Sequence, residues 1–259
     1  MGKKRLLLSA VSIAVVACII LWCVGQVRDR VYRGKSLSQW LKAYDPRILI
    51  DNKEEVDDAI RHIGTNAIPT LLEMLRSKNN AVVAAAVKQA EKADLIWLSL
   101  AEERHAEAAR GFEVLGPSAK DAVPALIAIY NERISPDSQM ATAYALGCIG
   151  PAARNAIPQL LEAATNADCN VRQCAIRSLG QIHSEPELSV PVAIRALDDT
   201  NQLARFEAAN ALRAFGTNAK AAIPSLVRAF KSKDKHINKT AADALKAIDV
   251  EAAAEAGIN

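Results

Sequence analysis

The chain has 259 residues, of which 51% are apolar and only 4% aromatic, and its formal net charge is +3. Lys3, Lys4 and Arg5 carry that excess, so the rest of the chain is neutral and lacks the broad basic face that nonspecific nucleic-acid binding requires. Because aromatic side chains are so few, a core of small aliphatic residues favours closely packed helices over a β-sheet.

The first segment of the chain is apolar, and residues 6–24 carry no charged side chain. As a helix this segment would be about 28 Å long, which is close to the thickness of a bilayer core. Trp22 near its end suits a membrane interface. The sequence therefore predicts one transmembrane helix over residues 6–24, after a short basic tail at residues 1–5 and before a linker at residues 25–35.

Charges on both sides of this segment bear on where the rest of the chain lies. The basic tail favours a cytoplasmic N-terminus and a body in the periplasm or another extracytoplasmic space, which is our prediction. The basic residues after the segment favour a cytoplasmic body instead: Arg28, Arg30, Arg33 and Lys35. Two alternatives stay open. In the first, VVAC at residues 15–18 resembles a lipobox, and Cys18 would be lipidated. In the second, the apolar segment is an ordinary signal peptide that is cleaved off.

The next stretch, residues 36–64, predicts a helical hairpin. Ser36 is a good N-cap for a helix that begins at Leu37. Residues 56–63 place apolar side chains at helical spacing before Gly64, which is expected to end the second helix. Together these features predict a terminal repeat that caps the fold.

Residues 66–116 predict a longer and irregular unit. Its first helix begins with NAIPTLLE at residues 66–73. Further helices are expected over residues 81–92 and 102–115, with a link at residues 94–100 between them. The apolar sequence LIWL in that link has two interpretations, which are packing on the edge of the fold and a patch for a partner.

The phrase at residues 66–73 recurs as DAVPALI at residues 121–127, NAIPQLLE at residues 155–162 and AIPSLV at residues 222–227. The prolines of the last four units are 34, 33 and 33 residues apart: Pro124, Pro158, Pro191 and Pro224. The glycines expected to end the helix before each unit are 34, 30 and 36 residues apart: Gly116, Gly150, Gly180 and Gly216. A period in this range is typical of a solenoid.

One unit, residues 155–180, shows how the local sequence builds a two-helix hairpin. Asn155 can cap the first helix. Pro158 then lies in the first turn, where backbone N–H groups have no partner inside the helix. Asp168 can cap the second helix, which Gly180 is expected to end as a left-handed C-cap residue. Because one hairpin cannot bury its own apolar face, the units must stack.

These units resemble HEAT repeats, including the bacterial HEAT-like group. The resemblance rests on the first-helix phrase Ala-Ile/Val-Pro-x-Leu and on second-helix endings, which read TAYALG at residues 142–147, AIRSLG at 175–180 and ANALR at 209–213. It implies an all-α, right-handed α-solenoid of about six hairpins over residues 36–249, followed by a C-terminal tail at residues 250–259. The expected units are residues 36–64, 66–116, 121–150, 155–180, 187–216 and 221–249.

In HEAT repeats a turn Asp and a second-helix Arg often link neighbouring units. Asp168 and Arg172 match that pattern. Other units depart from it, since Asp234, for example, is followed at the Arg position by Asn238. The sequence therefore does not predict a continuous Asp–Arg ladder.

The sequence gives few signs of catalytic or metal chemistry. Outside the first apolar segment the cysteines are an odd number for a disulfide framework and are interpreted as small buried side chains: Cys148, Cys169 and Cys174. The polar cluster at residues 102–105, which ends with His105, is interpreted as a solvated helix start. No phosphate-binding loop, metal-ligand spacing or nucleophile motif is found. No cofactor, metal or small-molecule ligand is therefore expected.

We expect a non-enzymatic, membrane-anchored scaffold that binds an unknown protein on the concave surface lined by second helices. One alternative is a HEAT-like enzyme, such as a bilin lyase subunit or a DNA glycosylase, and another is a structural envelope spacer without a ligand. A glycosylase would need a basic groove with aromatic side chains, which disfavours nucleic acid as a partner of this chain. The candidate contact residues are Gln139, Tyr144, Arg172, Gln173, Arg177, Arg205, Arg213, Asn238 and Lys239.

Overall fold

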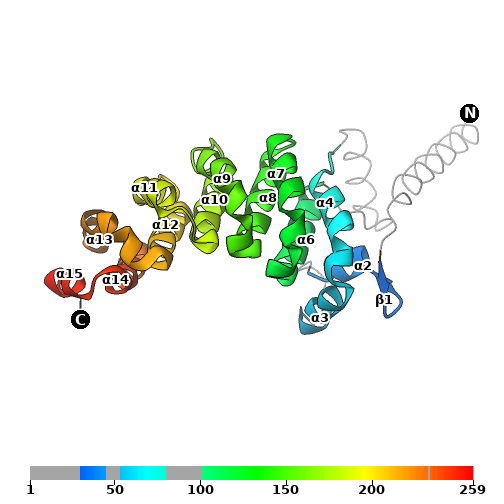
Figure 1. Ribbon diagram of the computed structural model, residues 1–259, viewed down its shortest axis with the longest axis horizontal. Helices are drawn as coiled ribbons and strands as arrows, with labels where there is room; N and C mark the ends of the chain where they lie inside the picture. The colour runs from blue at the N-terminus through cyan, green and yellow to red at the C-terminus, as the bar shows by residue number, and fades with distance from the viewer. Residues whose placement is uncertain (1–29, 45–52, 80–100, 233, 259) are drawn as a thin grey trace, which may run out of the picture.

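The computed structural model describes residues 30–44, 53–79, 101–232 and 234–258. These residues are almost entirely helical. Figure 1 shows the helices stacked side by side along one long axis, from the N-terminal helices in blue to the C-terminal helices in red.

The membrane prediction is corrected. No helix in the described part of the chain is long and apolar enough to cross a membrane, which conflicts with a single-pass anchor. The expected localisation at a membrane, with the body on either side of it, is therefore withdrawn. Residues 6–24 and Cys18, on which that expectation rested, lie outside the described residues, as do the expected helix at 81–92 and the link at 94–100.

A small β-hairpin lies at the N-terminal edge and was not predicted. β1 (Val31–Tyr32) pairs antiparallel with β2 (Lys35–Ser36). Trp40 donates a hydrogen bond from Nε1 to the carbonyl oxygen of Tyr32 at 3.1 Å. Part of the expected linker at residues 25–35 is therefore folded against the first helix.

The predicted first hairpin is present. α2 (Leu37–Lys42) begins at Ser36, whose hydroxyl oxygen accepts a hydrogen bond from the Gln39 N–H at 3.3 Å. The Gln39 side chain accepts one from the Ser36 N–H at 2.7 Å, which completes a capping box. α3 (Lys53–Ile63) is followed by Gly64, which has a φ of 62°.

The other described helices form two rows. The first helices of the units are α4 (Ile68–Leu75), α7 (Val123–Asn131), α9 (Ile157–Ala163), α11 (Pro186–Ala196) and α13 (Ile223–Phe230). The second helices are α6 (Ala101–Leu115), α8 (Pro136–Ile149), α10 (Cys169–Ile182), α12 (Gln202–Phe215) and α14 (Lys235–Ile248). Each first helix packs on the second helix of its own unit, and consecutive second helices pack on one another. This arrangement confirms a helical solenoid.

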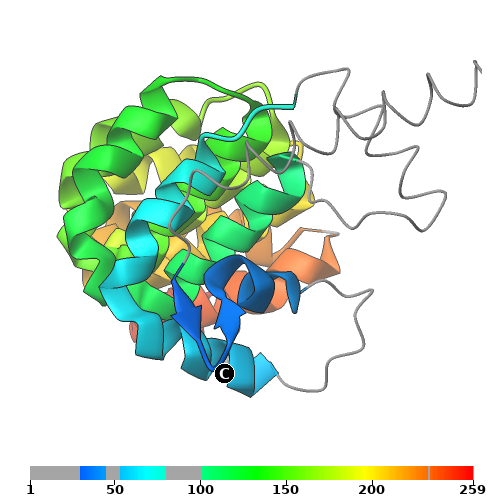
Figure 2. The same ribbon diagram turned by 90° about the vertical axis from the view of Figure 1, so that its right-hand side faces the viewer.

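The two rows are packed differently. Consecutive second helices are in extensive contact from α6 to α14, whereas consecutive first helices touch each other at few positions. We call the surface that the second helices present to solvent the inner face. Figure 2, which looks along the stack, shows that the helices also turn about the long axis.

Short 3₁₀ helices precede four of the first helices: η1 (Gly64–Ala67), η2 (Gly116–Ala122), η3 (Gly150–Ala156) and η4 (Gly216–Ala222). The predicted Asn155 cap is wrong. η3 runs directly into α9, and the Ile157 N–H bonds back to the carbonyl oxygen of Arg154, so no side chain caps this helix. Pro158 is the second residue of α9 and lies in the first turn, as predicted.

The prediction that Gly180 ends the second helix of its unit is also wrong. α10 continues to Ile182, and His183, with a φ of 50°, is the left-handed C-cap residue. His183 therefore takes the place of the glycine that follows α6, α8 and α12. The spacing of these positions becomes 34, 33 and 33 residues, which is more regular than the predicted series.

Gly180 is instead a packing glycine. A Cβ atom built on it would lie 2.7 Å from the Cα and 2.8 Å from the Cβ of Ala211 in α12. Gly147 takes the equivalent position in α8, where a Cβ atom would lie 2.3 Å from the Ser178 Oγ of α10. The missing side chains allow α8, α10 and α12 to approach one another closely.

His105 in α6 is buried, with 1% of its surface exposed, which corrects the prediction of a solvated helix start around it. Its Nε2 lies 3.0 Å from the carbonyl oxygen of Ser77, just after α4. Glu102, three residues earlier, is exposed. The helix start is therefore solvated on one side only.

The expected C-terminal tail at residues 250–259 contains a helix. α15 (Val250–Glu255) begins at Asp249, whose side chain accepts a hydrogen bond from the Ala252 N–H at 3.1 Å. Ala253 and Ile258 are buried in the cluster of apolar side chains that includes α14. These residues cover the last second helix of the stack.

Candidate binding surface

The nine residues predicted as partner contacts all lie on second helices, but in two settings. Four of them occupy one aligned position, ten residues before the end of their helix: Gln139, Arg172, Arg205 and Asn238. The other five are half-buried or exposed along the inner face: Tyr144, Gln173, Arg177, Arg213 and Lys239.

Arg172 is held inside the solenoid. Its Nε and Nη2 each donate a hydrogen bond to the Asp199 carboxylate at 2.8 Å. Its Nη1 donates to the carbonyl oxygens of Asn166 and Ala167 at 2.9 and 3.0 Å. Only 15% of the Arg172 side chain is exposed, and its guanidinium lowers the pKa of the Asp199 carboxyl below the usual value. Because Asp199 belongs to the next unit, Arg172 joins two units.

Arg205 repeats this arrangement one unit later. Its Nη2 lies 2.5 Å from the Asp234 carboxylate, and its Nη1 donates to the Asp199 carbonyl oxygen at 2.8 Å. In the last unit Asn238 replaces the Arg and donates to the carbonyl oxygen of Ser232 at 3.1 Å, among others. The chain thus contains a short ladder that the sequence did not predict, because each Arg pairs with an Asp 27 or 29 residues further along the chain. These three predicted contact residues hold the solenoid together.

Tyr144 and Arg177 lie at the centre of the inner face. They occupy aligned positions on α8 and α10, five residues before the end of each helix. The guanidinium carbon of Arg177 lies 5.0 Å from the centroid of the Tyr144 ring, which makes a cation–π contact. Both side chains are half-buried, so the pair is fixed in place and still reaches the surface.

Acidic and thiol groups surround this pair. Burial raises the pKa of the Tyr144 hydroxyl, and the charges of Cys148 and Glu113 add to that effect. Burial also raises the pKa of Cys148 and of Cys174 to about 11 in each case. Burial raises the pKa of the Glu207 carboxyl, and the Arg177 charge acts against that increase. We call this set the inner-face cluster: Glu113, Tyr144, Cys148, Cys174, Arg177 and Glu207.

The two cysteines of the cluster are free and half-buried, whereas the sequence predicts fully buried side chains. The sequence analysis did not predict that either cysteine reaches the surface, although their spacing from the predicted contact residues indicates it. Cys148 stands four residues after Tyr144, and Cys174 stands three residues before Arg177, so each lies on the same side of its helix as the predicted contact. With pKa values near 11, both thiols stay protonated at neutral pH and are poor nucleophiles and metal ligands.

Two exposed apolar side chains extend the inner face on α12. Phe206 is 38% exposed and Leu203 is 53% exposed. Phe206 occupies the position aligned with Gln173 and Lys239, and it precedes Glu207 of the inner-face cluster. The contact residues predicted from sequence do not include Phe206.

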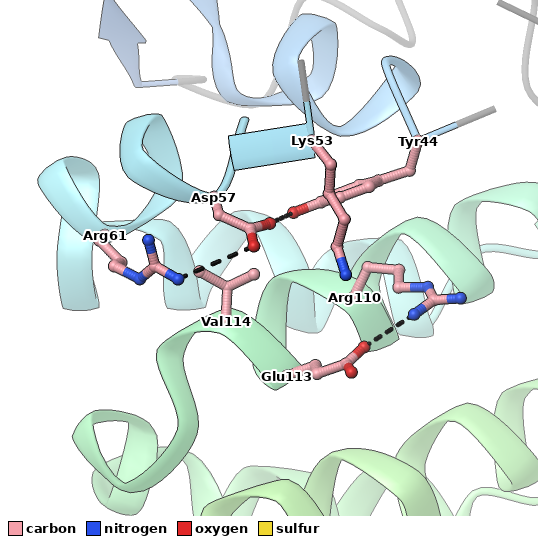
Figure 3. A pocket seen from close by; sticks show the side chains of 7 residues that line it. All are labelled: Tyr44, Lys53, Asp57, Arg61, Arg110, Glu113 and Val114. Atoms are coloured by element: carbon pink, nitrogen blue, oxygen red, sulfur yellow. Dashed lines mark hydrogen bonds and ion pairs between the residues drawn. The ribbon is translucent and has the colours of Figure 1, made fainter. Parts of the chain in front are cut away.

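A small pocket opens at the N-terminal end of this face, between α3 and α6 (Figure 3). Its volume is about 140 Å³, and it is lined by Tyr44, Lys53, Asp57, Arg61, Arg110, Glu113 and Val114. The Tyr44 hydroxyl donates a hydrogen bond to Asp57, and Arg61 lies 3.7 Å from the same carboxylate. Arg110 donates to Glu113 at 3.0 Å. Glu113 therefore belongs both to this pocket and to the inner-face cluster.

Metal-binding side chains do not gather in the described ranges. No group of three or more His, Cys, Asp or Glu residues there is arranged to hold a metal ion.

Among the solved structures with a similar fold are three engineered or designed proteins. A designed armadillo repeat protein in complex with the peptide (KR)4 matches with a TM-score of 0.52 and 15% identity, over 83% of this chain and 100% of that chain. Two engineered proteins match at 22% identity, with TM-scores of 0.49 and 0.47. They cover 83% and 85% of this chain, and 96% and 71% of their own chains. At these identities the likeness shows the fold alone.

No curated protein matches the chain. A family model described as HEAT repeats matches residues 123–213 and 190–256, which together make up more than half of the chain. The matched residues hold the Tyr144–Arg177 pair, the Arg172 and Arg205 ion pairs and the packing glycines of α8 and α10. The chain therefore belongs to the HEAT-repeat family.

Proposed function

We propose that this chain is a non-enzymatic scaffold that binds a segment of a partner protein along the inner face of its second helices. The observation that carries the proposal is the stacked Tyr144–Arg177 pair, which is half-buried at the centre of that face and flanked by Glu113 and Glu207. Tyr and Arg are the residue types that most often dominate binding energy at protein interfaces, particularly when they are central and partly desolvated.

The wider surface supports the same proposal. Phe206 offers an exposed aromatic side chain, and Gln173, Arg213 and Lys239 offer polar contacts on neighbouring helices. Arg172, Arg205 and Asn238 are left out of the proposed surface, because they are engaged within the solenoid. A designed armadillo repeat protein with a similar fold has been solved with a bound peptide, which is an analogy for how a stack of this kind holds an extended segment.

A non-enzymatic role is the better match to the chemistry of the cluster. A nucleophilic cysteine needs a lowered pKa, but burial raises the pKa of Cys148 and Cys174 to about 11. The groups at the centre of the inner face are thus suited to contact and not to attack on a substrate.

The proposal is tested by photo-crosslinking in the cells from which the gene comes. A photoreactive amino acid is placed at Gln173 on the inner face, and at the exposed Lys120 in η2 as a control. A protein captured from Gln173 and not from Lys120 is then purified, and its affinity for the full chain is measured. We expect Arg177→Ala to weaken that affinity at least tenfold, which corresponds to about 1.4 kcal/mol.

The matched control is Arg154→Ala, which removes an exposed Arg away from the cluster. Arg177→Lys separates charge from stacking, because a Lys keeps the charge but loses the planar contact with Tyr144. Equal capture from both positions, or unchanged affinity in Arg177→Ala with a native melting curve, would remove the inner face as the binding surface.

A further inference from the structure

The pocket between α3 and α6 has a distinct charge balance. Three cationic side chains and two carboxylates line it, and Arg61, one of the three, also donates a hydrogen bond to the Asp58 carboxylate at 2.8 Å outside the lining. Both carboxylates are already engaged, Asp57 by Tyr44 and Arg61, and Glu113 by Arg110. In the described part of the chain the Lys53 ammonium makes no ion pair, and the side chain is exposed.

Figure 3 shows the Lys53 side chain extending from α3 toward Arg110 and Glu113 on α6. Lys53 and Arg110 thus line the same small space, and the Arg110 guanidinium is turned toward Glu113. A guanidinium has five N–H donors, and the Arg110–Glu113 contact leaves several of them available. An anionic group in this space would gain charge-assisted hydrogen bonds from Lys53 and Arg110.

The size of the pocket narrows the class of ligand. Small-molecule sites usually have volumes of about 300–1,000 Å³, and this pocket has about 140 Å³. A carboxylate on a short aliphatic stem fits a space of this size, and a nucleotide does not. The walls are also too polar for an apolar anchor, since five of the seven lining residues are charged.

The position of the pocket indicates where that carboxylate comes from. Glu113 lines the pocket, and its charge also raises the pKa of Tyr144 and Cys148 on α8. The pocket therefore shares Glu113 with the inner-face cluster, to which we assign partner binding. We propose that the pocket binds an acidic side chain of the partner segment, held by Lys53 and Arg110. This inference rests on the proposed function and adds the chemistry of the partner.

The probe is a fluorescein-labelled, N-acetylated and C-amidated peptide of eight residues that alternates Ala and Glu. Its anisotropy is measured with the full chain, beside matched peptides in which every Glu is replaced by Gln or by Lys. We expect the acidic peptide to bind at least tenfold more tightly than the Gln peptide, and to lose affinity at high salt because exposed charges are screened. Lys53→Met should weaken it at least tenfold, and Lys53→Arg should restore it.

Lys120→Met is the matched control, because it removes an exposed Lys of η2 that does not line the pocket. The inference is wrong if Lys53→Met binds the acidic peptide as the unchanged chain does, or if the Lys peptide binds best. Free glutamate is titrated as the second source of the same chemistry, and binding as tight as that of the peptide would make a metabolite the occupant and reject a partner segment.

The crosslinked partner separates this inference from the proposed function. If Arg177→Ala weakens its binding and Lys53→Met does not, the pocket has no part in binding and the inner-face proposal stands. If neither variant weakens it, both fail. If both variants weaken it, an acidic side chain of the partner should be identified, and its replacement by the amide should cost the same affinity as Lys53→Met.

Discussion

His105 shows at the scale of one residue how burial fixes a protonation state. Its ring is 1% exposed, Nε2 donates to the Ser77 carbonyl oxygen, and Nδ1 has no hydrogen-bond partner among the described residues. The neutral ring fits this setting, since protonation would bury a second N–H group without an acceptor. Burial is the main cause that lowers the pKa of His105, although the Ser77 contact and the charges of Asp137 and Glu102 act in the opposite direction.

This lowered pKa predicts a sensitivity to acid. The unfolded chain binds a proton at His105 more readily than the folded chain, so protonation favours unfolding. The free energy of unfolding therefore keeps its full value above the unfolded pKa of about 6.5 and decreases as the pH falls below it. We expect the urea midpoint of the unchanged chain to fall more between pH 7.5 and 5.5 than that of His105→Gln. His236→Gln, at an exposed position, is the control and should keep the full pH dependence. Identical pH dependence in all three proteins would contradict the assignment.

At the scale of the element, the close packing of the second helices depends on small residues at their contacts. The backbone of Ala211 in α12 lies where a Gly180 side chain would be, so neither helix can yield by a simple rotamer change. The atoms nearest to a Cβ on Gly147 belong to side chains of α10 and include the Ser178 Cβ at 2.8 Å. Both contacts therefore leave no room for a side chain, and at Gly180 the obstacle is the backbone of α12.

We expect Gly180→Val to destabilise the protein by about 1–3 kcal/mol, the usual cost of overpacking a well-packed contact. Ala214→Val introduces the same side chain at an exposed position of α12 and should cost below about 1 kcal/mol. Urea unfolding followed by circular dichroism measures both. A similar loss in the two variants would mean that α10 and α12 can separate without cost.

The helices themselves could be predicted from sequence because their signals are local. Apolar spacing, the Ser36 and Asp168 caps and the proline phrases each act within a few residues. The end of α10 could not be predicted, because a glycine can serve either as a C-cap or as a close helix contact. The actual C-cap is His183, a residue type that does not mark a helix end in the sequence. The Asn155 cap failed for a related reason, since a preceding 3₁₀ helix supplies the carbonyl group that the cap would replace.

The candidate surface was predictable only in part. Tyr144 and Arg177 could be found as polar residues on second helices, and the structure brings them into contact. Arg172 matches in sequence a pattern that often links neighbouring units, but it was still predicted as a partner contact. The structure shows that its charge is used within the fold, because it pairs with Asp199 of the next unit. The pocket needs side chains from α3 and α6, whose relative placement no local pattern contains.

At the scale of the whole molecule, the Arg172–Asp199 and Arg205–Asp234 pairs couple successive units along one seam. In a solenoid each unit contacts only its neighbours, so the stability of the stack depends on these interfaces. The first of the two pairs is the better shielded, with 15% and 12% of its side chains exposed. It should therefore contribute more than the ion pairs on the surface.

We expect Asp199→Ala to cost about 1.5–3 kcal/mol, the range for hydrogen bonds to charged groups. Glu162→Ala is the matched control. It also removes a carboxylate paired with an Arg of another unit, Arg133 at 2.6 Å, but those side chains are 69% and 52% exposed. Its cost should stay below about 1 kcal/mol. Urea unfolding of both variants decides the matter, and equal losses would show that burial of the pair is unimportant.

α15 has a consequence for how molecules of this chain meet each other. It lays Ala253 on the apolar side of α14, while Glu251 and Glu255 face outward. A helix stack with a bare apolar end can accept another copy head to tail, and that addition repeats without closure and grows a filament. Here α15 covers that side of α14, so a second copy could pack directly on α14 only after α15 had moved away.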